Sequence, residues 1–281
     1  MTLKQALGRA RGILAANNVE DASLECELLL GHALGINRTQ LYLSIDHELT
    51  LEQEETFWYL IERYLSKEPI AYIIGHREFY GLDFHVGPGV LIPRPESELL
   101  VEKAFRLAQN YTLSTIADIG TGCGAIAISL ALNLPQTEIY ATDISALALK
   151  VAQVNCEKHG VEDSICLLQG DMLDPVPETV DLIIANLPYI KESKLSTLYP
   201  ANFEPQLALN GGSDGLEKIY CLCRQVSGRL RPGGRLLLEI GQGQRMAVTT
   251  FLHDLFHSAK IEVAADLGGI DRVVSVTWLD T

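Results

Sequence analysis

Four consecutive residues, Asn186 to Tyr189, carry the groups with the clearest chemical use in this sequence. They directly follow an apolar run, 180–185, that is typical of a buried β-strand. The side-chain oxygen of Asn186 and the backbone carbonyl of Leu187 can each accept one N–H of a planar NH2 group. Pro188 keeps the residue before it extended, and the ring of Tyr189 can lie against a flat acceptor. These four residues are the predicted catalytic residues for chemistry at an amide or amino nitrogen.

Holding such a nitrogen matters because an amide lone pair is delocalised into the carbonyl and is a poor nucleophile. Two accepted hydrogen bonds aim the developing lone pair along the axis of the bond that breaks. The nitrogen becomes cationic as it attacks, so both hydrogen bonds strengthen in the transition state. Taken alone, an Asn-x-Pro-Tyr segment is also an ordinary turn. Its place at the end of a strand, in an α/β domain with a glycine loop, favours the functional interpretation over the ordinary turn.

That glycine loop follows the first predicted strand of the domain, 115–119. Glycines there let the backbone turn sharply and approach a ligand without a β-carbon in the way. The next strand ends at Asp143, whose carboxylate can accept hydrogen bonds from both ribose hydroxyls of an adenosine. These motifs indicate an adenosine-containing cofactor, and residues 186–189 favour S-adenosylmethionine over a dinucleotide. The predicted cofactor-binding residues are Gly120, Thr121, Gly122, Cys123, Gly124, Asp143, Asp171, Met172 and Asn186.

The domain organisation follows from two regions of different pattern. Apolar residues recur at helical spacing from residue 2 to about 70, with Asp21 as a predicted cap and a capping-box pattern from Thr50 to Gln53. Aromatic and β-branched residues around Gly81 then suggest a hairpin. We expect a helical bundle over 1–73, a β-hairpin linker over 74–90 and an α/β domain over 91–281.

In that α/β domain, short β-rich runs alternate with helical stretches, which is typical of a parallel, doubly wound sheet. Gly268 and Gly269 form a short turn between the last two strands, which predicts an antiparallel pair. We expect a seven-stranded, Rossmann-like, mostly parallel sheet with an antiparallel last strand. The predicted strands are 115–119, 137–142, 164–169, 180–185, 235–240, 261–265 and 272–277. The predicted helices are 123–133, 145–159, 215–229 and 243–257.

Composition excludes some classes of protein. The chain has 281 residues, 22 basic and 36 acidic side chains and a formal net charge of -14. That balance argues against a protein whose main task is to grip nucleic-acid phosphates. No apolar run approaches the ~18 residues that cross a bilayer, and the first residues lack the apolar core of a signal peptide. We expect a cytoplasmic monomer with no metal ion, no direct nucleic-acid binding and no membrane association.

Over nearly its whole length the chain resembles the release factor glutamine methyltransferases, a protein-(glutamine-N5) methyltransferase family that modifies peptide chain release factors. The resemblance implies that S-adenosylmethionine binds at the glycine loop, Asp143, Met172 and Asn186, and that residues 186–189 hold the glutamine of a Gly-Gly-Gln motif. It also implies that the helical domain recognises the protein substrate. The most specific matching segments are 79–81, 90–98, 117–124, 186–189 and 204–205, with further matches at 211–212, 214–216, 239–241 and 271–274.

The chain departs from the family pattern at Leu187, where proline is usual. Leucine keeps the backbone carbonyl and the next proline still restrains it, so we expect activity from a looser site. Ser97 stands where threonine is common. Arg94 and Glu96 allow two interpretations, a place near the cofactor or a structural ion pair. Glu239 is expected to be a buried carboxylate that accepts hydrogen bonds from backbone donors.

Three other functions fit part of the pattern. Methylation of an exocyclic nucleobase amine would use the same geometry, because that amine is also planar and conjugated, but the net charge disfavours it. A nicotinamide-dependent oxidoreductase would leave residues 186–189 unexplained. A non-catalytic module would bind the cofactor and transfer nothing.

Overall fold

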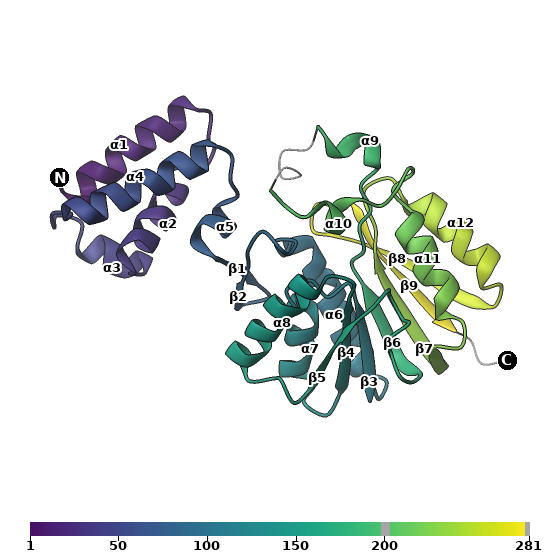
Figure 1. The fold of residues 1–281 in the computed structure, drawn as a ribbon. Helices are drawn as coiled ribbons and strands as arrows, with labels where there is room; N and C mark the ends of the chain where they lie inside the picture. The colour runs from purple at the N-terminus through teal and green to yellow at the C-terminus, as the bar shows by residue number, and fades with distance from the viewer. Residues whose placement is uncertain (198–202, 279–281) are drawn as a thin grey trace. The chain divides into compact units, whose positions relative to one another are not determined.

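The structure, a computed structural model, describes residues 1–197 and 203–278. The chain divides into two compact units, Met1–His76 and Arg77–Thr281. Figure 1 shows the first unit as helices and the second as a sheet with helices packed on it. Among the described residues, no helix is both long and apolar enough to span a membrane.

The first unit is a helical bundle with its own apolar core. The capping box at the start of α4 is confirmed, because the Thr50 hydroxyl accepts from the Gln53 backbone N–H and the Gln53 side chain accepts from that of Thr50. Asp21 occupies the N-cap position of α2 as predicted, but its side chain makes no capping hydrogen bond. The helices are α1 (Leu3–Ala16), α2 (Ala22–Leu34), α3 (Arg38–Leu43), α4 (Leu51–Leu65) and α5 (Ile70–Ile74).

A short hairpin follows, formed by β1 (His76–Phe79) and β2 (Leu82–His85). Its turn residues, Tyr80 and Gly81, both have positive φ. The Gly81 backbone N–H donates to the Glu78 carboxylate at 2.6 Å, which closes the turn locally. The hairpin predicted around Gly81 is therefore confirmed.

Seven strands form the sheet of the second unit, in the order β5-β4-β3-β6-β7-β9-β8. Neighbouring strands are parallel except that β9 runs antiparallel to both β7 and β8. This confirms the predicted fold class, and the antiparallel last strand is inserted between β7 and β8. The strands are β3 (Thr115–Ile119), β4 (Glu138–Asp143), β5 (Ile165–Gln169), β6 (Val180–Ala185), β7 (Leu230–Glu239), β8 (Ala259–Ala265) and β9 (Asp271–Trp278).

Helices cover the sheet on both faces. Side chains of α11 (Glu217–Val226) and α12 (Arg245–Leu255) share one buried core with alternate strand residues. The intervening strand residues, which point to the other face, are buried as well. That face carries the layer of α6 (Glu98–Ala108), α7 (Ala125–Asn133) and α8 (Ala146–His159), whose helices contact one another. The shorter helices are η1 (Pro95–Ser97), α9 (Glu192–Leu195) and α10 (Gln206–Leu209).

Element boundaries differ most from the prediction at β7. The strand begins at Leu230 rather than at 235, because Val180 pairs with Leu230 before the register shifts and Leu182 pairs with Arg235. The residues between, which include Pro232 and two glycines, gave a turn signal that hid the first pairing. Pairing with a distant strand has overridden the local pattern.

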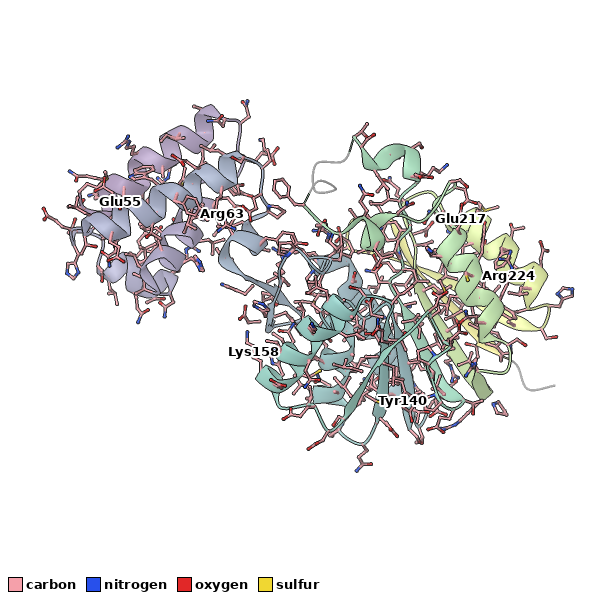
Figure 2. All side chains as sticks on the ribbon, viewed as in Figure 1. Glu55, Arg63, Tyr140, Lys158, Glu217 and Arg224 are labelled. Carbon is pink, nitrogen blue, oxygen red and sulfur yellow. The ribbon has the colours of Figure 1, made fainter. Side chains whose placement is uncertain are left out.

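Asn155, a fully buried side chain on α8, connects the hairpin and the glycine loop to the body of the domain. Its Oδ1 accepts from the His85 backbone N–H at 2.7 Å, and its Nδ2 donates to the carbonyls of His85 and Cys123, each at 2.9 Å. Lys158 of the same helix, labelled in Figure 2, forms an ion pair with Asp83 of β2 at 2.6 Å.

Replacing Asn155 by alanine should lower the free energy of unfolding by about 3 kcal/mol, because three backbone groups lose a partner that is itself fully buried. Urea unfolding followed by circular dichroism measures the change. Gln153→Ala, an exposed change on the same helix, is the matched control and should be nearly neutral. Equal stability of the two variants would contradict the role given to Asn155.

Candidate active site

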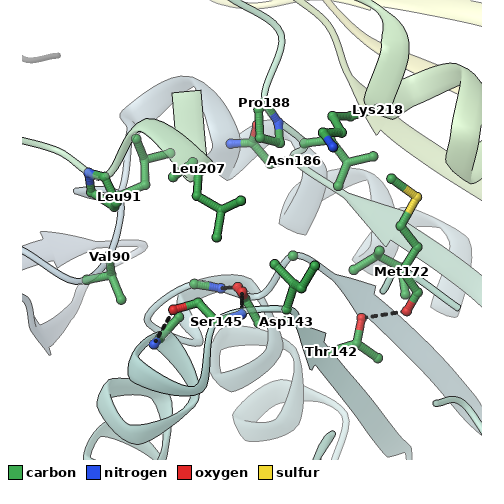
Figure 3. A pocket seen from close by; sticks show the side chains of 18 of the residues that line it. Val90, Leu91, Thr142, Asp143, Ser145, Met172, Asn186, Pro188, Leu207 and Lys218 are labelled. Carbon is green, nitrogen blue, oxygen red and sulfur yellow. Dashed lines mark hydrogen bonds between the residues drawn. The ribbon is translucent and has the colours of Figure 1, made fainter. Parts of the chain in front are cut away.

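The pocket of interest lies at the carboxyl ends of β3, β4, β5 and β6. Ligands of open α/β sheets bind at this edge, where the strand order changes direction. Here β4 and β6 flank β3 on opposite sides, so the change occurs at β3. Figure 3 shows the pocket. Its lining includes Val90, Leu91, Gly120, Gly122, Thr142, Asp143, Ile144, Ser145, Gly170, Asp171, Met172, Asn186, Leu187, Pro188, Leu207, Ala208 and Lys218.

The glycine loop is held from behind, so its backbone faces the pocket. Gly120 and Gly122 have φ of +73° and +59°, a conformation that favours glycine. The backbone N–H groups of Gly120 and Thr121 both donate to the Thr142 carbonyl at 2.9 Å. The Thr121 hydroxyl donates to the buried carboxyl of Asp118 at 2.7 Å. Burial raises the pKa of Asp118 to about 6.

Asp143 lies in the pocket wall at the end of β4, where the sequence predicts it (Figure 3). One carboxylate oxygen accepts from the Gly122 backbone N–H at 3.0 Å and the other from that of Ser145 at 2.8 Å. Burial raises the pKa of Asp143, and these two hydrogen bonds act in the opposite direction. Each oxygen keeps a further lone pair, so the carboxylate can still accept hydroxyl protons.

The remaining walls combine apolar side chains with one more carboxylate. Met172 is buried with φ of +50°, and its carbonyl accepts from the Thr142 hydroxyl at 2.9 Å. Asp171 beside it is exposed. Ile144 and Leu207 line the pocket and are about half exposed. Apolar walls beside a strand-end carboxylate fit the base and ribose of an adenosine, so the residues present suit S-adenosylmethionine.

Three residues of the predicted cofactor site do not line this pocket. Thr121 is bonded to Asp118, as described. Cys123 is buried, which raises the pKa of its thiol to about 12, and its carbonyl accepts from Asn155. Gly124 is the N-cap residue of α7, and an added Cβ there would contact that helix and α8. These three residues shape the loop, whereas Gly120 and Gly122 present its backbone to the pocket.

Residues Asn186 to Tyr189 lie where this pocket meets a smaller one. Three of the four line both pockets, and Tyr189 lines the smaller one alone. The Leu187 side chain is buried over the glycine loop, and a Cβ on Gly120 would lie 3.3 Å from its Cδ2. The lining of the smaller pocket is Leu91, Arg94, Asn186, Leu187, Pro188, Tyr189, Ile190, Ala208 and Leu209.

Three glycines let the backbone close tightly around Pro188 and Tyr189. A Cβ added at Gly211 would lie 2.7 Å from the Pro188 carbonyl oxygen, and one at Gly215 would lie 2.5 Å from that of Tyr189. A Cβ at Gly241 would lie 2.9 Å from the Tyr189 ring. No real Cβ approaches other atoms so closely, so only glycine fits at these positions without a shift of the neighbouring chain.

Behind the tetrapeptide, Asn186 and Tyr189 both connect to the buried carboxylate of Glu239. The Asn186 Nδ2–H donates to Ser97 Oγ at 2.8 Å, and the Ser97 hydroxyl donates to Glu239 Oε2 at 2.6 Å. The Tyr189 hydroxyl contacts Glu239 Oε1 at 3.3 Å. Glu239 is buried as expected, but the prediction of backbone donors is wrong, because these partners are side-chain hydroxyls that come from distant parts of the chain.

Burial determines the protonation state of the Glu239 carboxyl. It raises the pKa of Glu239 to about 6, against the lowering effects of Ser97, Arg272 and Tyr189. Glu239 is therefore mostly ionised at neutral pH and acts only as an acceptor. Burial and then the Glu239 charge raise the pKa of Tyr189 to about 12, so its hydroxyl stays a donor.

Arg94 forms an ion pair, although with a partner far along the chain. Its guanidinium lies 2.5 Å from the buried Glu204, whose other oxygen accepts from the Ile92 backbone N–H at 3.0 Å. Arg94 also lines the smaller pocket. Glu96 is exposed. Arg94 therefore both forms an ion pair, with Glu204 and not with Glu96, and lines a pocket, so its functional role stays a prediction.

Sequence reasoning missed several lining residues. Ser145 carried a signal, because it follows Asp143 closely and its hydroxyl caps α8. Leu207 and Lys218 come from α10 and α11, and no local pattern marks them. Within the described ranges, no group of three or more His, Cys, Asp or Glu residues could hold a metal ion.

Gly211→Ala should lower the free energy of unfolding by about 1–3 kcal/mol, because the new methyl group overlaps backbone that cannot rotate away. Thermal or urea unfolding measures the effect. Gly87→Ala, where an added Cβ meets nothing within 4 Å, is the control. A Gly211→Ala protein as stable as the control would show that this packing is less rigid than described.

Comparison with known proteins gives matches over both units. Residues 5–75 match the PrmC N-terminal domain family, and residues 95–203 match the methyltransferase small domain family. A release factor glutamine methyltransferase of Moorella thermoacetica is 45% identical over 275 residues, which covers 97% of each chain. Another, of Geobacter sulfurreducens, is 40% identical and covers 97% of this chain and 95% of its own.

Solved structures agree on the fold. A ribosomal protein L11 methylase from Lactobacillus delbrueckii subsp. bulgaricus matches with a TM-score of 0.51 at 22% identity, over 70% of this chain and 84% of its own. A methyltransferase from Pyrococcus furiosus matches with a TM-score of 0.53 at 20% identity, over 77% of this chain and 96% of its own. Likeness at this identity shows the fold alone, whereas the full-length relatives show the family: the chain belongs to the release factor glutamine methyltransferases and is an S-adenosylmethionine-dependent methyltransferase.

Proposed function

We propose that this enzyme transfers a methyl group from S-adenosylmethionine to the side-chain nitrogen of the glutamine in the Gly-Gly-Gln motif of peptide chain release factors. The observation that carries the proposal is that Asn186, Leu187 and Pro188 line both the larger pocket and the smaller one beside it. A methyl donor in the first and a glutamine in the second would meet at these residues. The names of the full-length relatives support the choice of acceptor.

We assign the larger pocket to the cofactor. Asp143 would accept the ribose hydroxyls, and the backbone at Gly120 and Gly122 would allow close approach of the ligand. Asp171 and Met172 would contact the adenosine from the end of β5. When bound, S-adenosylmethionine supplies an electrophilic methyl group on a sulfonium.

The tetrapeptide would orient the acceptor. Asn186 Oδ1 and the Leu187 carbonyl each accept one N–H of the glutamine side chain, so that its nitrogen lone pair points toward the methyl group. The Tyr189 ring fixes the plane of the amide. Both hydrogen bonds strengthen as the nitrogen gains positive charge. The buried packing of Leu187 over the glycine loop restrains the segment where the family pattern has proline.

The helical bundle would serve to recognise the release factor. In support, Leu43, Leu51 and Tyr59 are 80%, 81% and 60% exposed. A protein partner that covered these three side chains would remove their apolar surface from water. The monomeric state, the cytoplasmic location and the absence of direct nucleic-acid binding stay predictions.

The direct test is to incubate purified release factor with the enzyme and S-adenosylmethionine and to analyse the tryptic peptides by mass spectrometry. One methyl group is expected on the Gly-Gly-Gln peptide and none when that glutamine is replaced by alanine. Asn186→Ala should lower kcat by about a hundred-fold or more, since one of two oriented acceptors is lost. Asn110→Ala, an exposed change, is the matched control.

A parallel incubation with DNA and RNA oligonucleotides tests the nucleobase amine as acceptor. Methylated oligonucleotide together with an unmodified glutamine peptide after exhaustive incubation would contradict the proposal.

A further inference from the structure

Asn186 is the first member of a row of hydrogen bonds that runs away from the pocket. Its Nδ2 contacts Ser97 Oγ, and Ser97 Oγ contacts Glu239 Oε2. The three residues come from the end of β6, from η1 and from the end of β7. Ser97 and Glu239 are 3% and 1% exposed, so water does not compete for these bonds. Figure 3 shows Asn186 on the pocket wall.

The direction of this row follows from counting protons. An ionised carboxylate has no proton to donate, so the Ser97 hydroxyl must donate its only proton to Glu239. Toward Asn186 the same oxygen can therefore only accept. The Asn186 amide must then present its NH2 to Ser97, which leaves its Oδ1 on the opposite edge of the amide. Among the described residues, no donor is bonded to that Oδ1.

The direction of these hydrogen bonds decides whether Asn186 can accept an N–H of the incoming NH2 group. The oxygen and nitrogen of an asparagine amide are nearly equal in size, so packing alone hardly distinguishes the two orientations related by a half-turn. Only one orientation offers an acceptor to an incoming NH2 group. In the other, two NH2 groups would face each other as donors.

We infer that Ser97 and Glu239 are positioning residues that hold the Asn186 amide in the orientation that accepts the glutamine N–H. This inference rests on the proposed function of Asn186. The same carboxylate also takes the hydroxyl of Tyr189, so one buried charge orients both ends of the tetrapeptide. Ser97 and Glu239 act through these neighbours without contact with the glutamine.

The first test compares Ser97→Ala with Ser97→Thr. Loss of the hydroxyl should lower kcat by about ten- to a hundred-fold, the equivalent of one hydrogen bond to a charged network. Threonine restores the hydroxyl and should return kcat to within a few-fold of the parent. Calorimetric affinity for S-adenosylmethionine and the melting temperature show whether each variant is folded. A folded Ser97→Ala enzyme with the parent kcat would overturn the inference.

A double-mutant cycle separates positioning from a merely structural role. If Ser97 acts through Asn186, then Ser97→Ala combined with Asn186→Ala should be no slower than Asn186→Ala alone. Additive losses in the double variant would show that Ser97 supports the reaction by another route and would overturn the inference.

The second test is the pH profile of kcat at saturating substrates. Burial raises the pKa of Glu239 to about 6. Protonation below that pH turns the Glu239 carboxyl into a donor, so the Ser97 hydroxyl no longer has to donate to it. Ser97 can then donate to Asn186, and the Asn186 amide no longer prefers the orientation with its NH2 toward Ser97. The parent kcat should therefore fall as pH decreases through about 6. The charged or titratable groups that act on Glu239 are Arg272, Tyr189 and Glu96, and Arg272 forms an ion pair with Asp266.

Glu239→Gln removes this ionisation, so the variant should be slower at neutral pH and its kcat should not change between pH 5 and 7, a window set about one unit either side of the Glu239 pKa. If kcat of Glu239→Gln still falls at low pH, the fall belongs to another group, such as Asp118, whose pKa is also about 6. That result would contradict the pH argument.

The outcomes also separate the two proposals. A parent enzyme that leaves release factor unmodified refutes the proposed function. An active parent whose Ser97 and Glu239 variants have the same kcat refutes only the positioning role.

Discussion

A buried carboxylate that can only accept hydrogen bonds constrains the whole transfer site. Glu239 ends β7, takes one hydroxyl from η1 and one from the segment after β6, and so connects three parts of the chain behind the pocket. An unpaired carboxylate at this depth would be costly. Its need for donors therefore fixes Ser97 and Tyr189, and Ser97 in turn fixes which edge of Asn186 faces the pocket. The orientation of a neutral amide is set by a charge two hydrogen bonds away.

The fold brings this arrangement to the right place. Parallel strands deliver Asp143, Met172 and Asn186 to one edge of the sheet, because their carboxyl ends meet there. Glycines then allow close packing, of the Leu187 side chain on Gly120 at the cofactor side and of backbone on backbone at Gly211 on the transfer side. The chemistry relies on neutral acceptors held in fixed directions, so rigidity of the surrounding loops matters more than the strength of any one group.

What the sequence predicts well is local. The strand that ends at Asp143 and the segment 186–189 were identifiable because an apolar run leads directly into polar residues. The loop residues Thr121 and Cys123 were harder to assign, since some residues of the glycine loop line the ligand pocket and others form the hydrogen bonds that fix the loop. Residue types alone do not show which neighbour has which role. The divided roles appear only when Asp118 and Asn155 are seen as their partners.

What the sequence could not predict depends on contacts between distant residues. Ser97 and Glu239 lie 142 positions apart, and Arg94 and Glu204 lie 110 apart. No periodicity or turn signal encodes such pairs. The first pairing of β7 with Val180 was hidden for the same reason. The family motifs include these segments, but the direction of the hydrogen bonds depends on the three-dimensional structure.

Neutron diffraction from deuterium-exchanged crystals at neutral pH, with S-adenosylhomocysteine and a Gly-Gly-Gln peptide bound, tests the central claim most directly. We expect the Asn186 deuterium atoms on the edge that faces Ser97, the Ser97 deuterium directed at an unprotonated Glu239, and the glutamine nitrogen about 2.7–3.2 Å from Asn186 Oδ1. A deuterium atom on Glu239, or an Asn186 oxygen turned toward Ser97, would contradict the account.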